Sequence, residues 1–475
     1  MKPVLTRYRA LTLAVTLGVV ALTVDRPVAQ TPAEPGATPG VVLTNISKNT
    51  PKFASVFPQV AISPADDKVV AVAWRQYGLP IDTNAPKGQR TAECHVSISK
   101  DGGETFTDTN LMPYLRRERV SAAEPELWYC NAPWVAFGPD GAIYAGGSLF
   151  TADGVIAEEP KQGRARLTVS ADGGVTWTAG THGITPTTFA PGTNAPAAPE
   201  NTPWDGAHGM VDPRTGAFFT IAGGSFAISE DHAKTFTLVR QTMLPDGWQR
   251  QRNGTMSVSH GLLIVPFFAS AVPVTGATCP CLVVGTSGDD GKTPITPHLV
   301  AQADAINPQG TVRYPISAAD RNRPGRFAVS TYTADHRNVV VHYTEDGGGT
   351  WKSVSPKPPA PPNVPVANAN QTGIGYTTDG RVLVVWRGFR QQGAFNTFAA
   401  MLDGGVFGPT VKVSPESSMY PPLTYVGNYG SGNGGGDFTT WITGSREYAF
   451  VAFPYAPMGV VEDTYLGRIP LSIMK

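Results

Sequence analysis

Four arginines stand beside short apolar segments that are typical of strands: Arg75, Arg252, Arg313 and Arg387. The four are far apart in the sequence, so only the fold can bring them together. Guanidinium groups that converge on one carboxylate form charge-assisted, bidentate pairs with it. These residue types therefore indicate a site for an anionic ligand, with Asn253 and Tyr314 next to two of the arginines. The alternative for each arginine is a rim charge or a structural ion pair.

A second set of residues can transfer protons or attack carbon: Glu126, Asp205, His208 and Tyr429. Asp205 and His208 share the segment Trp204-Asp205-Gly206-Ala207-His208, and Tyr429 lies in Gly427-Asn428-Tyr429-Gly430. Each also has a structural alternative. Asp205 can cap a turn, His208 can hydrogen-bond inside a channel, and Tyr429 can stack on a channel wall.

One short pattern recurs along the chain and organises these segments. Its first copy is Ser99-Lys-Asp101-Gly-Gly103-Glu-Thr105-Phe106. The aspartates of the five copies are Asp101, Asp172, Asp231, Asp289 and Asp346, at intervals of 71, 59, 58 and 57 residues. A worn sixth copy, Leu402-Asp403-Gly404-Gly405, follows after another 57 residues. A carboxylate that accepts backbone N–H groups and glycines with positive φ predict a hairpin turn in each copy.

This pattern resembles the Asp box, or BNR repeat, of the sialidase-like β-propellers. In that superfamily the box joins the two outer strands of a blade, far from the central pocket, so it indicates fold more than activity. A period of about 58 residues suits one four-stranded blade. We therefore predict an all-β, seven-bladed β-propeller over residues 41–475, with six blades, the number in sialidases, as the alternative.

Closure of the ring can also be predicted. Seven polar or small-residue lead-ins precede pairs of apolar strands, and the last blade ends on Tyr465–Leu471 with no chain left for a fourth strand. The early segment Val41–Ser47 can fill that place and remove the exposed edges. Gly467-Arg468-Ile469-Pro470, which looks like the arginine motif of sialidases, then lies within a strand of this blade.

The resemblance assigns roles to the candidate residues. Sialidases hold a sugar carboxylate with three arginines, attack with a Tyr activated by a Glu, and protonate with an Asp. By this analogy Arg252, Arg313 and Arg387 form the clamp, with Arg75, Asn253 and Tyr314 nearby. Tyr429 is then the nucleophile, Glu126 its activator and Asp205 the acid. The expected ligand is a carbohydrate or another anion at the channel mouth.

This sequence departs from the sialidase pattern in two ways, so other functions remain open. The arginine motif that sialidases carry before the first box is missing before Asp101, and seven blades exceed their six. The first alternative is a polysaccharide lyase, in which His208, Tyr314 or Tyr429 removes a proton beside a uronate that Arg252 and Arg313 neutralise. The second is a non-catalytic propeller that binds a glycan or a protein.

Composition and the N-terminus bound the class of protein. The 52 Gly and 43 Pro disfavour a helical bundle, and the net charge of zero argues against nucleic acid as a partner. Lys2, Arg7 and Arg9 precede the apolar run 10–24, which predicts a signal peptide at 1–29 rather than a membrane span. Residues 30–40 form a Pro/Ala/Gly-rich tether. We expect a secreted or periplasmic monomer.

The four cysteines fit an oxidising compartment. Cys94 and Cys130 are expected to form a disulfide, and the state of Cys279 and Cys281 is left open by their Cys-Pro-Cys spacing. No phosphate-binding loop, nucleophile elbow or zinc-binding motif occurs in the sequence. We therefore assign no cofactor and no metal.

Overall fold

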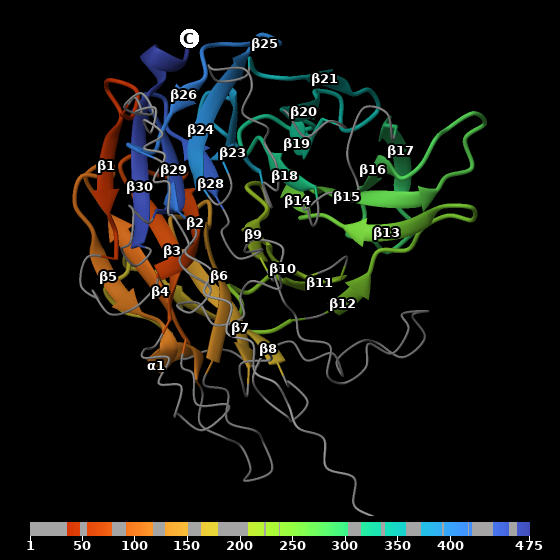
Figure 1. Cartoon of the computed structure of the whole chain (residues 1–475). Coiled ribbons are helices and arrows are strands. Elements are labelled where there is room, and N and C mark those ends of the chain that lie inside the picture. The colour runs from red at the N-terminus through yellow and green to blue at the C-terminus, as the bar shows by residue number, and fades with distance from the viewer. Residues whose placement is uncertain are drawn as a thin grey trace, which may run out of the picture. The chain divides into compact units, whose positions relative to one another are not determined.

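The computed structural model describes the chain from residue 36 onward, with gaps. The described residues are 36–47, 55–77, 92–116, 129–150, 163–178, 208–222, 225–236, 238–302, 315–333, 338–357, 372–391, 394–416, 418–419, 440–455 and 463–475. The predicted signal peptide lies outside them. Short strands dominate these ranges, and the helices among them are α1 (Met112–Leu115) and the 3-10 helix η2 (Leu471–Met474). Figure 1 shows the strands gathered into separate small sheets.

The first four blades follow one another along the chain, each running from an inner to an outer strand. Blade 1 holds β2 (Ser55–Ile62), β3 (Val70–Tyr77), β4 (Ala92–Ser99) and β5 (Thr107–Asn110). Blade 2 holds β6 (Tyr129–Phe137), β7 (Ile143–Phe150) and β8 (Gly163–Ser170). Blade 3 holds β9 (His208–Val211), β10 (Phe218–Ala222), β11 (Ser225–Ser229) and β12 (Leu238–Gln241). Blade 4 holds β13 (Gln249–Asn253), β14 (Ser257–Ser259), β15 (Leu262–Ala271), β16 (Cys281–Ser287) and β17 (Thr296–Ala301).

The last three blades continue the same antiparallel order. Blade 5 holds β18 (Ile316–Ala319), β19 (Phe327–Tyr332), β20 (Val339–Thr344) and β21 (Lys352–Val354). Blade 6 holds β22 (Gly373–Tyr376), β23 (Val382–Gln391), β24 (Ala394–Asp403) and the short β25 (Val406–Phe407), β26 (Val411–Lys412) and β27 (Ser418–Met419). Blade 7 holds β28 (Trp441–Gly444), β29 (Tyr448–Tyr455), β30 (Asp463–Pro470) and β1 (Val42–Asn45).

The inner strands of the described blades form a closed ring. Their order around the ring is β2, β6, β9, β14, β18, β22 and β28, each in contact with the next, and β28 contacts β2 again. This order confirms seven blades, and the six-bladed alternative is wrong. A seventh blade fits because blade 7 is completed by the N-terminal segment rather than by a further stretch of C-terminal chain.

Strand β1 joins the two ends of the chain. Val42 pairs with Arg468 and Asn45 with Tyr465 along the outer edge of β30, so the predicted closure of the last blade is confirmed (Figure 1). Arg468 lies within β30 as expected, and its Nη1 contacts Glu104 Oε1 of blade 1 at 2.9 Å. The last residues of the expected tether also contact the propeller, since Thr38 N donates to the carbonyl of Lys412 at 2.9 Å.

Each repeated turn connects the third strand of its blade to the segment that follows. In the first turn, Gly103 N donates to Ser99 Oγ at 2.8 Å and Thr105 Oγ1 donates to Asp101 Oδ2 at 2.5 Å. The hydrogen bond from Thr105, with backbone N–H groups and Ser99, holds the pKa of Asp101 well below its usual range. Gly103 has φ +86, and a Cβ there would meet Phe450 of blade 7 at 3.2 Å. Glycine therefore lets the turn approach the neighbouring blade closely.

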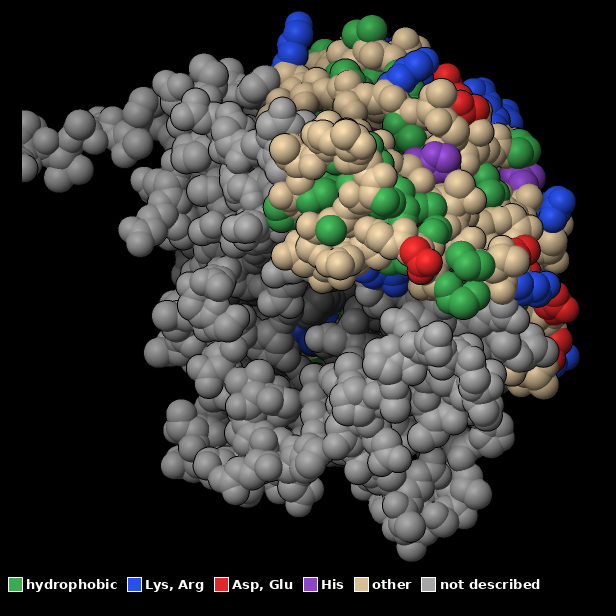
Figure 2. Space-filling model, turned by 90° about the vertical axis from the view of Figure 1, so that its right-hand side faces the viewer, with side chains coloured by type: hydrophobic (Ala, Val, Ile, Leu, Met, Phe, Trp, Pro, Cys, Tyr) green, Lys and Arg blue, Asp and Glu red, His purple; other side chains and the backbone are tan. Residues whose placement is uncertain are grey.

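The hydrophobic core lies between adjacent blades. Between blades 1 and 2, for example, Ala71 and Val96 pack with Val135 and Ile143. Cys94 of β4 and Cys130 of β6 are joined by a disulfide across the same interface, with Cα atoms 5.6 Å apart. On the face in Figure 2, basic and acidic side chains lie beside one another over the described surface, in keeping with the balanced composition.

Candidate functional site

A channel runs between the inner strands of the ring. It encloses a cavity of about 240 Å³ to which all seven inner strands contribute. Most of its lining is aliphatic, including Val60, Val135, Met210, Val258, Ile374 and Ile442, while Ser257 and Ser317 add hydroxyl groups. The channel interior is therefore suited to packing rather than to charge chemistry. Polar chemistry has to be sought at its ends.

The two ends of the channel differ in which connections surround them. In each blade we count the strands outward from the channel, and neighbouring strands run in opposite directions. The end of the channel where each first strand begins is here called the mouth. The connections from second to third strands lie at the same end. At the other end, the base, each first strand turns into its second strand. His208 begins β9 and Trp441 begins β28, so both lie at the mouth. The mouth is where the candidate residues were predicted to gather.

His208 and Trp441 meet across the channel although they belong to blades 3 and 7. Their ring centroids are 5.2 Å apart with the planes tilted by 59°. The indole lines the channel cavity and contacts the imidazole at a tilt rather than by stacking on it. Trp441 was not among the predicted site residues. Trp441 could have been predicted from the sequence as an aromatic residue at the first position of an inner strand.

The imidazole of His208 is a polar group in an apolar surrounding. Burial lowers its pKa to about 4, because the charged form loses its hydration inside the channel. His208 is therefore neutral at neutral pH, and its Nδ1 is a buried polar atom without a hydrogen-bond partner among the described residues.

Two of the four predicted arginines are described, and both are buried at the mouth ends of second strands. Arg75 in β3 is 0% exposed, and Arg387 in β23 is 1% exposed. Arg75 follows Ala71 and Ala73, which pack with blade 2, so the alternation of β3 directs its side chain to that side.

Arg387 follows the same logic in blade 6. Leu383 and Val385, which alternate with Arg387 along β23, pack with blade 7, whereas its contact residue Phe395 belongs to the core that blade 6 shares with blade 5. Its guanidinium carbon lies 4.8 Å from the ring centroid of Phe395. Such stacking orients the guanidinium fork. A third buried arginine, Arg166 in β8, is 5% exposed and was not predicted, since no lead-in marks its position.

The side chains of seven other candidate residues are not described by the structure. Glu126, Asp205, Arg313, Tyr314 and Tyr429 lie outside the described residues. Arg252 and Asn253 lie in β13, where the structure describes only their backbone, paired with Phe268 and Phe267 of β15. The site that is described thus consists of His208 and Trp441 at the channel, with Arg75 and Arg387 at the blade interfaces.

Within the described ranges, no group of three or more His, Cys, Asp or Glu side chains is arranged to hold a metal ion. None of the described helices has the length and apolar character that a membrane crossing needs. The propeller class rests on the strand order and the closed ring.

Comparisons with known proteins give matches among solved structures only. No protein-family model matches the sequence, and no curated protein matches it. Among solved structures, a protein of unknown function from Dyadobacter fermentans is similar, with a TM-score of 0.45 and 13% identity over 91% of this chain and 99% of that one.

Sialidases are also among the similar structures. The Hadza microbial sialidase Hz136 has a TM-score of 0.45 and 13% identity over 91% of this chain and 69% of its own. A sialidase of Trypanosoma rangeli, solved with 2,3-difluoro-KDN, has a TM-score of 0.44 and 12% identity over 92% of this chain and 59% of its own. At these identities the likeness concerns the fold alone.

Proposed function

We propose that the protein is an exported, sialidase-like glycoside hydrolase that acts on an acidic sugar bound at the channel mouth. Arg252, Arg313 and Arg387 hold the sugar carboxylate in this proposal. Tyr429 attacks the anomeric carbon after losing its proton to Glu126, and Asp205 protonates the leaving oxygen. Water then hydrolyses the glycosyl-enzyme.

The observation that carries the proposal is the position of Arg387. Its guanidinium is buried at the mouth end of β23 and stacked on Phe395. A guanidinium fixed in this way binds a carboxylate with little loss of rotamer freedom. In the sequence, Arg387 of blade 6 precedes the lead-in of blade 7, which contains the proposed nucleophile Tyr429.

The direct test is release of a sugar from fluorogenic glycosides. The mature chain is incubated with methylumbelliferyl α-sialoside, β-glucuronide and, as a neutral control, β-glucoside. Turnover of an acidic glycoside that is abolished by Tyr429→Phe supports the proposal. Binding of the acidic sugars without turnover would instead assign a non-catalytic propeller.

His208 favours a second candidate, the polysaccharide lyase. A neutral imidazole at neutral pH can accept a proton, and its Nδ1 has no partner among the described residues. In that reaction His208 takes the C5 proton of a uronate, the C4–O bond breaks, and the product carries a C4–C5 double bond. Ultraviolet absorbance on incubation with polygalacturonate or alginate would identify the lyase, since a hydrolase product lacks that chromophore.

Export is part of the proposal. The Cys94–Cys130 and Cys279–Cys281 disulfides support it, because disulfides persist in oxidising compartments. Mass measurement of the N-terminus after expression with its natural leader tests it. Loss of about the first 29 residues is expected, and an intact N-terminus on the folded protein would contradict export by this route.

A further inference from the structure

A hollow lies at the base of the propeller, at the opposite end from the mouth. It has a volume of about 740 Å³ and is formed by turns of blades 5, 6 and 7 with the last residue of the chain. Six basic side chains line it: Arg323, Arg326, Lys352, Arg381, Arg446 and Lys475. Three acidic ones do so too: Glu345, Asp379 and Asp403. We call it the basal hollow, and it carries an excess of positive charge.

The worn sixth repeat explains why the hollow lies in this place. In the other copies a hydroxyl residue, an aspartate and a threonine occupy the turn, whereas here β24 and β25 are joined directly through Gly404 and Gly405. Both glycines have positive φ, +56 and +85. No described residue donates a hydrogen bond to the side chain of Asp403. The turn borders the hollow beside blade 5, where a Cβ at Gly405 would meet Tyr343 Oη at 3.1 Å, and Asp403 lines the hollow.

Some of the basic side chains are neutralised within the protein. Arg381 forms two hydrogen bonds to Asp379, with Nε to Oδ1 at 3.0 Å and Nη2 to Oδ2 at 2.7 Å. Arg326 contacts Asp320 at 3.1 Å and Glu345 at 3.4 Å. These three cation–anion contacts hold blades 5 and 6 in shape, and they leave the other cations of the hollow for a ligand.

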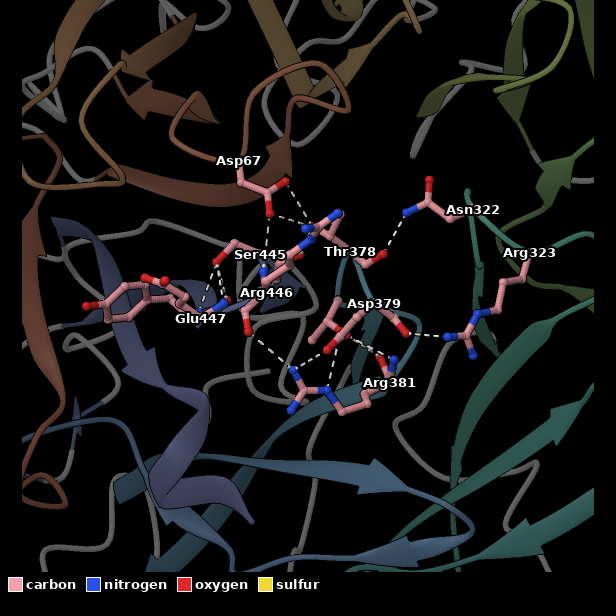
Figure 3. Close-up of polar contacts among 12 residues, drawn as sticks. Asp67, Asn322, Arg323, Thr378, Asp379, Arg381, Ser445, Arg446 and Glu447 are labelled. Atoms are coloured by element: carbon pink, nitrogen blue, oxygen red, sulfur yellow. Dashed lines mark hydrogen bonds and ion pairs between the residues drawn. The ribbon is translucent and has the colours of Figure 1, made fainter.

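Lys352 Nζ also lies 3.9 Å from Glu345 Oε2. The basic side chains of the hollow without an ion-pair partner among the described residues are therefore Arg323, Arg446 and Lys475. Arg323 Nη2 donates to the backbone carbonyl of Asp379 at 2.9 Å, which orients the guanidinium without neutralising it. The side chain of Arg446 has no ion-pair partner among the described residues. Figure 3 shows Arg323 and Arg446 on either side of the turn that carries Asp379 and Arg381. Arg323 comes from blade 5 and Arg446 from blade 7, and both side chains line the basal hollow.

The turns that carry these arginines are fixed by a network across four blades. Asn322 Nδ2 donates to the carbonyl of Thr378 at 2.6 Å, and Thr378 Oγ1 donates to Asp67 Oδ1 at 3.0 Å. Asp67 Oδ2 also accepts from Arg446 N at 3.3 Å (Figure 3). The backbone positions of the site are therefore set before any ligand arrives, which reduces the entropy lost on binding.

We propose that the basal hollow is a second binding site for an anionic saccharide. Arg323 and Arg446 bind its carboxylate or sulfate oxygens. The acidic and phenolic groups that share the hollow, Asp403 and Tyr343, accept hydrogen bonds from its hydroxyl groups. A site for an anion without hydroxyl groups, such as sulfate, would gain nothing from these acceptors. The volume falls within the range of small-ligand sites and suits one or two sugar rings.

This site is independent of the proposed hydrolase. It lies at the base, shares no residue with the mouth, and can exist whether or not the mouth is catalytic. A propeller with a ligand site at each end would hold an acidic glycan at the base while another part of the same polymer meets the mouth. The two sites therefore need separate tests.

Calorimetric titration of the full mature chain with glucuronate, inorganic sulfate and glucose tests the proposal. Glucuronate should bind more tightly than glucose, and the double variant Arg323→Gln/Arg446→Gln should weaken it by about 10- to 100-fold, as expected for lost charge-assisted hydrogen bonds. The matched control is Arg214→Gln, an exposed arginine in the corresponding turn of blade 3, which should leave binding unchanged.

Three results would overturn the proposal. The first is glucuronate binding no tighter than glucose, and the second is equal binding by the double variant and the Arg214→Gln control. The third is that the wild-type protein, with Asp403 and Tyr343 in place, binds sulfate as tightly as glucuronate. The hollow would then be a site for oxyanions without selectivity for a sugar. Melting curves establish that each variant is folded. Asp403→Asn gives a further check, because it should weaken glucuronate without affecting sulfate.

Discussion

His208 and Trp441 touch across the central channel, with ring centroids 5.2 Å apart, although 233 positions separate them in the sequence. The contact spans blades 3 and 7 and so depends on the whole ring being closed. Burial in the channel lowers the pKa of the His208 imidazole to about 4. The contact between His208 and Trp441 thus forms only when the propeller is closed. Protonation of the His208 imidazole is therefore expected to lower the stability of the propeller.

The first prediction concerns pH. Because the pKa of His208 is lower in the folded chain than in the unfolded one, the unfolded chain binds the proton first as pH falls. Stability is therefore lost progressively from about pH 6.5 to about pH 4, by up to about 3 kcal/mol. His208→Gln does not titrate, so its free energy of unfolding should change less across that window. Urea denaturation between about pH 7 and pH 4 measures the difference.

The control for this prediction is His232→Gln. The side chain of His232 is 57% exposed and lies outside the channel, so this variant should follow the wild type. Parallel stability curves for the wild type and His208→Gln would show that protonation at the channel mouth does not affect folding.

The second prediction compares a complete repeat with the worn one. Asp101 accepts hydrogen bonds from Thr105, Glu104 and Ser99, so Asp101→Ala leaves several donors of the turn without their acceptor. The melting temperature should fall by about 2–4 °C or more. Asp403→Ala removes a carboxylate with no such bonds among the described residues and should shift it by less. Equal shifts in differential scanning calorimetry would mean that the carboxylate bonds do not stabilise the turn.

The repeat explains which features of the fold were predictable. The pattern around Asp101 recurs at nearly constant spacing, so blade number and the pairing of β1 with β30 could be worked out from the sequence. The start of β28 was harder, because the chain before Trp441 is rich in glycine and carries no strand signal. The His208–Trp441 contact and the basal hollow depend on which side chains meet across a closed ring, and sequence spacing contains no such information.

The third prediction concerns the disulfides. Cys94 and Cys130 are 36 positions apart and join blade 1 to blade 2, whereas Cys279 and Cys281 are 2 positions apart. A longer loop restricts the unfolded chain more, so Cys94→Ala/Cys130→Ala should lose about 2–4 kcal/mol. Cys279→Ala/Cys281→Ala is the matched control and should lose much less. Urea titrations of both variants measure the order, and the reverse order would contradict the loop argument.

The last prediction separates a ligand clamp from a structural ion pair at Arg387. Lysine keeps the positive charge and most of the stem but lacks the planar fork that binds a carboxylate in two places. If Arg387 holds the sugar, Arg387→Lys should lower kcat/KM for an acidic glycoside by about 2–4 kcal/mol, or about 30- to 1,000-fold. Its melting temperature should stay within a few degrees of the wild type, since the charge and the packing on Phe395 are largely kept. Arg214→Lys, far from the mouth in an exposed turn, is the control.

A structural role for Arg387 predicts the opposite pattern, in which the melting temperature falls and turnover per folded molecule is unchanged. That pattern would remove Arg387 from the clamp and, with it, the observation on which the hydrolase proposal rests.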